Sequence, residues 1–296
     1  MNRRTGGDER NGHHRPFFPS GSRSILLLVS LLVILSGCSG FGNAPGGHDR
    51  LPPGLTGNGV EDLQALMDAH SRRLTDRPYT IENRFVSRAT GGKPGVRTHR
   101  VIRLGADPSR YLASSRTRTW GSCSPSRANR TVLRWSNGTA IAIKRSMENR
   151  STSLGSRNGV GLFYPEPTRG AFDEGLYVLL ARSDLAVRAA TGKHAFLLGG
   201  RISDRPGAVV STFDRTRNPP NASIVEASVR LIVTDRGLIR YWRVSWVVIR
   251  ADGDRYRESW TTEISAIGST RIHRPAWVDV ALANETAPTE VPGPIR

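Results

Sequence analysis

The chain has 296 residues, with 43 lysines and arginines against 25 aspartates and glutamates, a net charge of +18. Its length allows one large domain with a real hydrophobic core, and its two cysteines, Cys38 and Cys123, exclude a disulfide-stapled scaffold. The basic excess is almost entirely arginine spread along the chain, which indicates an attraction to anionic surfaces in general.

An uncharged apolar run from Ser24 to Ser39 ends in Leu35-Ser36-Gly37-Cys38. An apolar segment that follows arginines and ends in small residues at one cysteine predicts a lipoprotein signal peptide over residues 1–37, with lipid attached to Cys38. The run is shorter than the ~20 apolar residues that a membrane-spanning helix needs, so a simple transmembrane anchor is disfavoured. We therefore expect an exported protein, anchored by lipid to the extracellular side of the cell membrane.

This prediction has consequences for charge and for cysteine chemistry. Removing residues 1–37 takes away five basic and two acidic side chains and leaves a net charge of +15. Lipid headgroups are the nearest anionic partner of such a chain, and an exported protein rarely meets nucleic acid, so we expect none. A lipidated Cys38 leaves Cys123 as a lone thiol, whereas a Cys38–Cys123 disulfide is the competing arrangement.

The segment after Cys38 is rich in glycine and proline over residues 38–56, which predicts a flexible tether. A single α+β domain over 57–283 and a flexible tail over 284–296 are expected to follow. The domain opens with a helix that begins at Asn58 or Gly59. One apolar stripe marks this helix, and His70 within it is expected to be a packed, hydrogen-bonded residue: Leu63, Leu66, Met67, His70 and Leu74.

From Pro78 onward the apolar residues recur with a period of two, which predicts strands. Asn137-Gly138 between two of these runs indicates a hairpin, because both residues tolerate positive φ. The strands expected in this part form a meandering antiparallel sheet and cover 79–88, 98–104, 110–117, 130–135 and 139–145. The middle of the chain predicts a loop over 148–161, a helix over 172–190, a strand over 193–202 and an exposed connection over 204–221.

Three long strands are predicted near the end, over 225–233, 241–248 and 255–264, with turns at 235–237 and 252–253. Alternation places four aromatic residues on one face: Trp242, Trp246, Tyr256 and Trp260. Such a wall is either the core under a helix, which is the commoner case, or the floor of an apolar hollow that holds a ligand. The neighbouring arginines fall on the opposite face, which argues against a joint grip on nucleic acid.

Catalytic motifs are missing from the sequence. His99, His194 and His273 are scattered singly, and no zinc-protease helix, serine elbow or phosphate loop is present. Asp252 and Asp254 in a turn fall short of the oxygens that calcium takes. We therefore expect no enzyme activity, no metal and no cofactor, although a site assembled from distant strands would leave no local mark.

Glycan acceptor triplets occur in predicted turns, loops or the tail, where glycosylation of an exported chain is reachable. The five candidate asparagines are Asn129, Asn137, Asn149, Asn221 and Asn284.

Five stretches together resemble a family of uncharacterised lipoproteins from halophilic archaea, a domain of unknown function: LSGC, LPPGLTGNGVEDLQALMDAH, RWSNGT, VTDRGLIRYWRV and RPAWVDVAL. The resemblance implies a fold similar to lipoprotein carrier proteins, in which a large curved antiparallel sheet, a half-barrel, has a few helices packed on its concave face. It implies an apolar ligand, a lipid or isoprenoid, near the four aromatic residues. The alternatives are a structural or interaction protein of the cell envelope with a filled core and, less favoured, a hydrolase with a dispersed site.

Overall fold

A computed structural model of the chain describes residues 51–90, 95–120, 129–147, 150–158, 169–191, 194–203, 206–207, 209 and 223–283. All of them belong to one compact unit, His48–Arg296. The predicted signal peptide 1–37, both cysteines and the predicted tail 284–296 lie outside the described residues. No helix in the described segments is long and apolar enough to cross a membrane.

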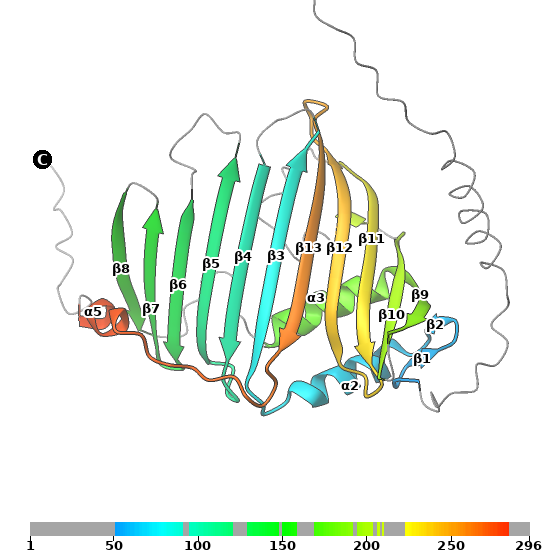
Figure 1. Ribbon diagram of the computed structural model, residues 1–296, viewed down its shortest axis with the longest axis horizontal. Coiled ribbons are helices and arrows are strands. Elements are labelled where there is room, and N and C mark those ends of the chain that lie inside the picture. Colours follow the sequence, from blue (N-terminus) through cyan, green and yellow to red (C-terminus); the bar gives the residue numbers. More distant parts are fainter. Residues whose placement is uncertain are drawn as a thin grey trace, which may run out of the picture. The chain divides into compact units, whose positions relative to one another are not determined.

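One antiparallel sheet of 11 strands dominates the fold (Figure 1). Its strands follow the order β8 (Arg150–Asn158), β7 (Ala140–Met147), β6 (Arg130–Asn137), β5 (Arg110–Trp120), β4 (Gly95–Leu104), β3 (Tyr79–Ala89), β13 (Arg255–Ser265), β12 (Ile239–Ile249), β11 (Ser223–Thr234), β10 (Ala195–Ile202) and β9 (Ser183–Ala190). The sheet is curved and not closed, which confirms the predicted α+β half-barrel.

Three helices pack against this sheet. Helices α2 (Leu63–Leu74) and α3 (Arg169–Ala181) cover one face, called the inner face below, and their apolar side chains join the main core. Helix α5 (Trp277–Ala283) packs on the opposite, outer face against Trp135 and Ala142. The prediction of helices on the concave face therefore holds for α2 and α3, while α5 is a short helix that the sequence analysis missed.

The entry to the domain is more ordered than predicted. Leu55–Thr56 form β1 and pair with β2 (Gly59–Val60), and Leu55 is buried. Residues 55–56 were expected to belong to the flexible tether and residues 59–60 to the first helical turn, but both are strands. Helix α2 begins only at Leu63, because the Asp62 side chain accepts a hydrogen bond from the Ala65 amide at 2.9 Å and caps the helix there.

The apolar stripe of α2 is confirmed. Leu66, Met67, His70 and Leu74 are all buried under the sheet. His70 Nδ1 accepts a hydrogen bond of 3.2 Å from the backbone amide of Ile239, so this histidine links α2 to strand β12. It is a packed core residue, as the sequence indicated.

Two predictions for the middle of the chain were wrong. The expected loop over 148–161 contains β8, a polar edge strand whose pairing with β7 needs only backbone groups. The expected helix over 172–190 is split, because α3 ends at Ala181 and the chain turns into β9. The Ser183 hydroxyl donates to the carbonyl of Leu179 at 2.6 Å at this junction, and Leu185 then pairs with Gly200 of β10.

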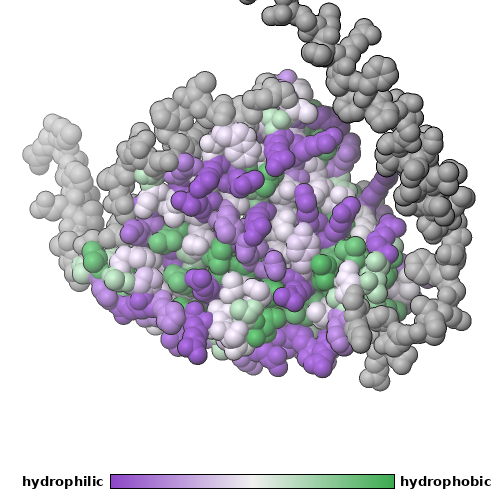
Figure 2. Space-filling model, in the orientation of Figure 1, coloured by the Kyte–Doolittle hydropathy of each residue, from purple (hydrophilic) through white to green (hydrophobic). Residues whose placement is uncertain are grey.

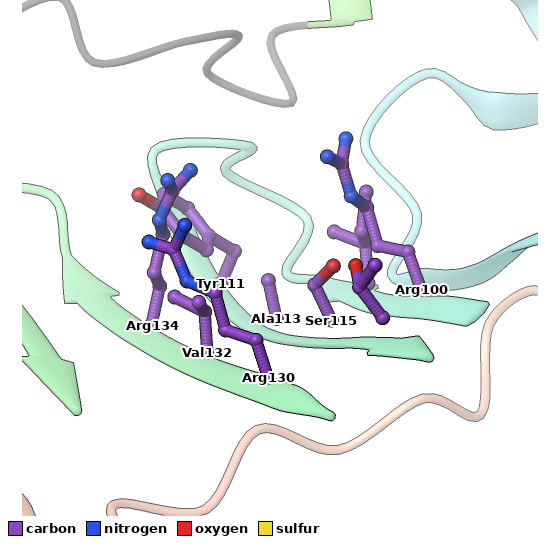
Figure 3. Close-up of a pocket in the computed structure, with 9 residues that line it drawn as sticks. Arg100, Tyr111, Ala113, Ser115, Arg130, Val132 and Arg134 are labelled. Atoms are coloured by element: carbon purple, nitrogen blue, oxygen red, sulfur yellow. The ribbon is translucent and has the colours of Figure 1, made fainter. Parts of the chain in front are cut away.

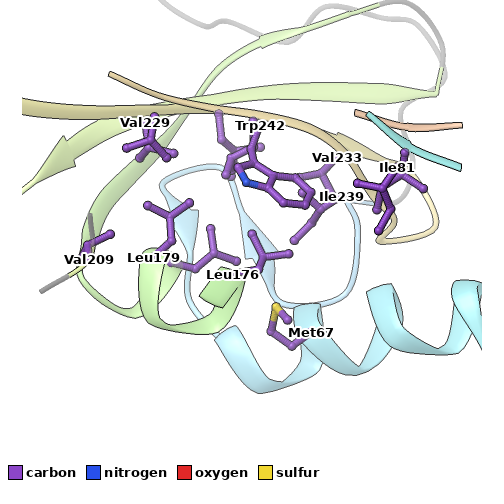
Figure 4. Packing of buried hydrophobic residues seen from close by; sticks show 14 of the residues in the cluster. Met67, Ile81, Leu176, Leu179, Val209, Val229, Val233, Ile239 and Trp242 are labelled. Carbon is purple, nitrogen blue, oxygen red and sulfur yellow. The ribbon is translucent and has the colours of Figure 1, made fainter. Parts of the chain in front are cut away.

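The main core lies between the inner face and the two helices. Leu176 and Leu179 of α3 and Met67 of α2 face Trp242, Val229 and other strand residues (Figure 4). Leu176 is fully buried, whereas its neighbour Tyr177 is 44% exposed. Helix α3 is thus held by one apolar stripe.

Substitution of these neighbouring residues tests the packing of α3. Leu176→Ala is expected to lower the free energy of unfolding by about 2–5 kcal/mol, because it leaves a cavity beneath the sheet. Tyr177→Ala, the matched control, is expected to change it by less than about 0.5 kcal/mol. Denaturant unfolding followed by circular dichroism measures both, and equal losses would contradict this position of the helix.

Candidate functional site

The buried face changes along the sheet. From β9 to β3 the inner face is buried in the main core, to which α2 and α3 contribute. On β4 and β5 only one end of this face joins that core, through Ile102, Leu104 and Tyr111. At β6 and β7 burial moves to the outer face, where α5 covers Trp135 and Ala142. The inner face of β4, β5 and β6 therefore carries polar and charged side chains at positions that would be core positions farther along the sheet.

The four aromatic residues predicted to line a ligand hollow lie on the inner face, as expected from their alternation. Trp242, Trp246 and Tyr256 are 1%, 3% and 6% exposed and belong to the main core, and Trp260 packs against it partly buried. Phe85 fills the space between the tryptophans, with ring centroids 6.2 Å from Trp246 and 6.3 Å from Trp260.

Polar partners hold two of these indoles in place. Trp246 Nε1 donates to Glu258 at 2.9 Å, and Glu258 also accepts a hydrogen bond of 2.8 Å from Ser87. Trp260 Nε1 donates to the Thr262 hydroxyl at 3.0 Å, and that hydroxyl donates to Asn83 Oδ1 at 2.8 Å. In the described part of the chain, Trp242, Trp246 and Tyr256 are thus buried core side chains and Trp260 packs against them.

A hollow of about 190 Å³ opens on the inner face of β4, β5 and β6 (Figure 3). Arg100 stands on β4 at one side, and Arg130 and Arg134 stand on β6 at the other. The short side chains of Ala113 and Ser115 form the floor between them. The remaining lining residues are Ile102, Tyr111, Thr117 and Val132.

The register of the strands explains this arrangement. Ser115 of β5 lies opposite Arg100 of β4 on one side and opposite Val132 of β6 on the other. Arg130 and Arg134 flank Val132 on the same face, two residues before and after it. Two strand spacings, roughly 10 Å, separate β4 from β6, so the guanidinium groups surround the floor without meeting across it.

The hollow is electropositive. None of the described residues that line it is acidic. Burial is the main cause that lowers the pKa of the Arg134 guanidinium. The nearby positive charges of Arg145 and Arg130 lower that pKa further, and Tyr111 partly opposes the shift. The charged form of Arg134 is therefore disfavoured by its surroundings, and an anion placed beside it would favour that form.

The donors around this hollow suit a phosphate or a carboxylate. Guanidinium groups present planar pairs of N–H donors to such anions, and the hydroxyls of Ser115 and Thr117 add donors at the floor. Ile102 and Val132 supply apolar contact beside them. The arrangement can hold a small anionic group attached to an apolar body.

This site was not predicted from the sequence, in which the strands 98–104, 110–117 and 130–135 were expected without an assignment of their faces. A signal was present. Arg100, Ile102 and Leu104 are two residues apart along one strand and therefore lie on the same face. Because Ile102 and Leu104 are buried, Arg100 lies on the face that forms the core. What the sequence did not indicate is that the helices leave this part of the face uncovered.

The other candidate residues lie apart from the hollow's floor. Of the five glycan acceptors, Asn129 and Asn137 are described, at the start and the end of β6, and Asn149, Asn221 and Asn284 lie outside the described residues. Asn137 Oδ1 accepts hydrogen bonds from the amides of Thr139 and Ala140 at 3.0 and 2.8 Å, which builds the predicted hairpin turn. Exposed His194 pairs with Asp235 at 2.9 Å.

No family model matches the chain, and no curated protein matches it. Several solved structures resemble parts of it, and three of them are the following. A β-barrel-like protein of domain of unknown function DUF1849 from Brucella abortus has 8% identity over 64% of this chain and 95% of its own, with a TM-score of 0.23. A DUF1329 family protein from Desulfovibrio piger has 10% identity over 72% and 95%, with a TM-score of 0.22. The ywiB protein from Bacillus subtilis has 9% identity over 65% and 96%, with a TM-score of 0.16. Likenesses with such low TM-scores do not assign a function to this chain.

The hydrogen bonds behind the tryptophan wall provide a test of its role as core. Thr262→Val keeps the volume but removes the hydroxyl that serves both Trp260 and Asn83. We expect a loss of about 1–3 kcal/mol in the free energy of unfolding, because two polar groups lose a buried partner. Thr261→Val on the outer face is the matched control and should cost less. A neutral effect of Thr262→Val in denaturant unfolding would contradict the buried chain of hydrogen bonds.

Proposed function

We propose that this protein is an exported, lipid-anchored binding protein of the cell surface, which holds an amphiphilic anion, such as a phosphorylated lipid or isoprenoid, by its head group. The observation that carries the proposal is the hollow with three arginines, Arg100, Arg130 and Arg134, and no acidic residue among its described lining. Guanidinium groups converging on a floor of small side chains favour a group with several acceptor oxygens.

The size of the hollow limits what enters it. About 190 Å³ is below the ~300–1,000 Å³ of pockets that enclose a drug-sized ligand. Only a head group therefore fits between the arginines, and the rest of the ligand lies outside. This differs from the apolar hollow expected near the tryptophans, where side chains already fill the space.

The anchor part of the proposal is supported by sequence. The run from Ser24 to Ser39 ends at Cys38 in a pattern typical of lipoprotein signals, and a lipid on Cys38 makes the membrane the first partner of this chain. Binding without chemical conversion is proposed, because the residues around the hollow are donors and apolar groups.

A second candidate is a structural or interaction protein of the cell envelope. The filled tryptophan wall favours it, since a solid core needs no ligand. The two candidates differ in what accompanies the protein when it is extracted: an amphiphilic anion in the first case and a partner protein in the second.

Decyl phosphate, decanoate and decanol, which share one chain length, test the hollow on the full-length protein. Decyl phosphate is expected to raise the melting temperature and decanol to leave it unchanged, because only an anion pairs with the arginines. The Arg100→Gln/Arg134→Gln variant should bind decyl phosphate about tenfold or more weakly, since it loses hydrogen bonds to a charged group. Comparing the shift in melting temperature caused by decanoate with that caused by decyl phosphate shows whether the hollow prefers a carboxylate or a phosphate head group.

The matched control is Arg72→Gln/Arg77→Gln, which removes the same charge from two exposed arginines, one in the last turn of α2 and one just after this helix. If this control weakens decyl phosphate binding as much as the variant in the hollow does, general charge and not the hollow is responsible. Equal stabilisation by decanol and decyl phosphate would also overturn the proposal.

The anchor has its own test. Protein extracted from membranes should show, by intact mass, a chain that begins at Cys38 and carries acyl lipid, and Cys38→Ser should release the protein from the membrane fraction. Lipid attachment to Cys38 requires a free thiol. An unmodified Cys38 bonded to Cys123 would therefore contradict the anchor and leave the anion site standing.

A further inference from the structure

The outer face of the sheet is densely covered by hydrophilic side chains. Figure 2 shows this face, in which hydrophilic groups gather over the strands and hydrophobic ones form smaller patches. Arginines dominate the hydrophilic set, at Arg84 and Arg88 on β3, Arg97 on β4, Arg116 and Arg118 on β5, Arg230 on β11, Arg243 on β12, and Arg255 and Arg257 on β13. All of them are exposed.

Arginines stand directly opposite one another at three places on this face. Arg97 pairs with Arg118, Arg88 with Arg257, and Arg230 with Arg243. Like charges at directly opposed strand positions destabilise a sheet. A protein that needed arginine only for solubility would gain by spacing these charges apart.

The acidic residues of this face neutralise other arginines. Glu82 accepts hydrogen bonds from Arg84 at 2.7 Å and from His99 at 2.8 Å, and Glu226 pairs with Arg255 at 3.2 Å. Burial acts to raise the pKa of Glu82, but these hydrogen bonds outweigh it and lower the pKa, so Glu82 stays charged. Within the part of the chain that the structure describes, the six opposed arginines have no acidic partner.

An exposed tryptophan adjoins two of the opposed pairs. Trp120 is 42% exposed, and its ring lies over Gly95, where an added Cβ would come within 2.3 Å of the ring. A broad hollow of about 650 Å³ at this end of β3, β4 and β5 is lined by Trp120 together with Arg88, Arg97, Arg118, Ala89, Thr119 and Asn129. An amphipathic ring thus lies beside three cationic groups at the rim of the face.

We infer that this outer face, centred on Trp120, Arg97 and Arg118, docks on a surface of anionic phospholipid. Arginines beside such a surface gain attraction to the headgroups, and tryptophan prefers the boundary between headgroups and acyl chains. The anionic headgroups supply the negative charge that the opposed arginine pairs lack.

A nucleic acid fits the same face less well. Proteins that bind single strands stack successive bases on several aromatic side chains. Trp120 is the one exposed tryptophan among the described residues of this face, since the other described tryptophans lie in the cores or pack against them. The other aromatic residue beside outer-face arginines, Tyr241 on β12, is half-buried and lies three strands away from β4, so the two rings do not form a row on which successive bases could stack. A membrane needs only charge and one interfacial anchor.

The test uses the full-length protein reconstituted into vesicles of phosphatidylcholine alone or mixed with phosphatidylglycerol, with bromine on the acyl chains near the headgroup. Bromine quenches tryptophan only at short range. The difference in quenching between the unsubstituted protein and the Trp120→Phe variant comes from Trp120 alone. We expect Trp120 quenching in the anionic vesicles and little of it in the neutral ones. Added salt should decrease the quenching in the anionic vesicles, because salt screens exposed charges.

Two variants separate docking from folding. Arg97→Gln/Arg118→Gln should lose the Trp120 quenching in anionic vesicles and raise the melting temperature without lipid, because one opposed pair is removed. Arg72→Gln/Arg77→Gln, of equal charge, should keep the quenching. Arg100→Gln/Arg134→Gln should keep it too, so this inference stands or falls independently of the ligand of the inner hollow.

Three outcomes would overturn the inference. The first is Trp120 quenching of equal size in neutral and anionic vesicles, and the second is none in either. Both outcomes are measured on proteins that keep all their arginines, so they do not depend on how the arginine variants fold. The third is a single-stranded oligonucleotide that changes Trp120 fluorescence at lower concentration than anionic vesicles do.

Discussion

Two short helices cannot cover a sheet of 11 strands, and the rest of the structure depends on this constraint. Helices α2 and α3 have 12 and 13 residues and are each about 18–20 Å long. Eleven strands at about 4.8 Å spacing extend over roughly 48 Å. The buried part of the inner face therefore shrinks beyond β4, and at β6 and β7 the sheet is buried from the other side by α5.

This change of the buried face creates the candidate site. Where α5 packs on Trp135, the inner positions of β6 no longer need apolar residues and hold Arg130 and Arg134. Long arginine stems can cover neighbouring apolar surface while their charged heads reach toward an opening. The hollow that we propose as an anion site thus lies at the boundary between the two cores, where small side chains such as Ala113 and Ser115 leave room.

Much of the fold could be predicted because most strands carry a clear period of two. The strands β3, β12 and β13 were found, and so were the turns at Gly138 and Gly253 with their positive φ. The errors have physical causes. Edge strand β8 is held by backbone pairing rather than by apolar alternation, and β9 follows α3 so closely that Leu185 seemed to continue the helical stripe.

The candidate site could not be predicted for a different reason. Alternation indicates that two faces of a strand differ, but it does not indicate which face a helix will cover. Trp242 and Trp246 are buried core residues, while Arg100, at an equivalent inner position on β4, lines an opening. Only the three-dimensional extent of α2 and α3 separates these cases.

The placement of the arginines is more informative than the net charge of +18. Charges that serve solubility alone are best placed apart and in water, where they cost little. Here Arg134 is partly buried with other arginines nearby, and Arg97 is opposed to Arg118 across two strands. Burial disfavours the charged form of Arg134, and like charges at directly opposed strand positions destabilise a sheet. The two proposed anion partners, a ligand head group on the inner face and anionic lipid on the outer face, would each offset such repulsion, which is why both proposals concern the two faces of β4 and β5.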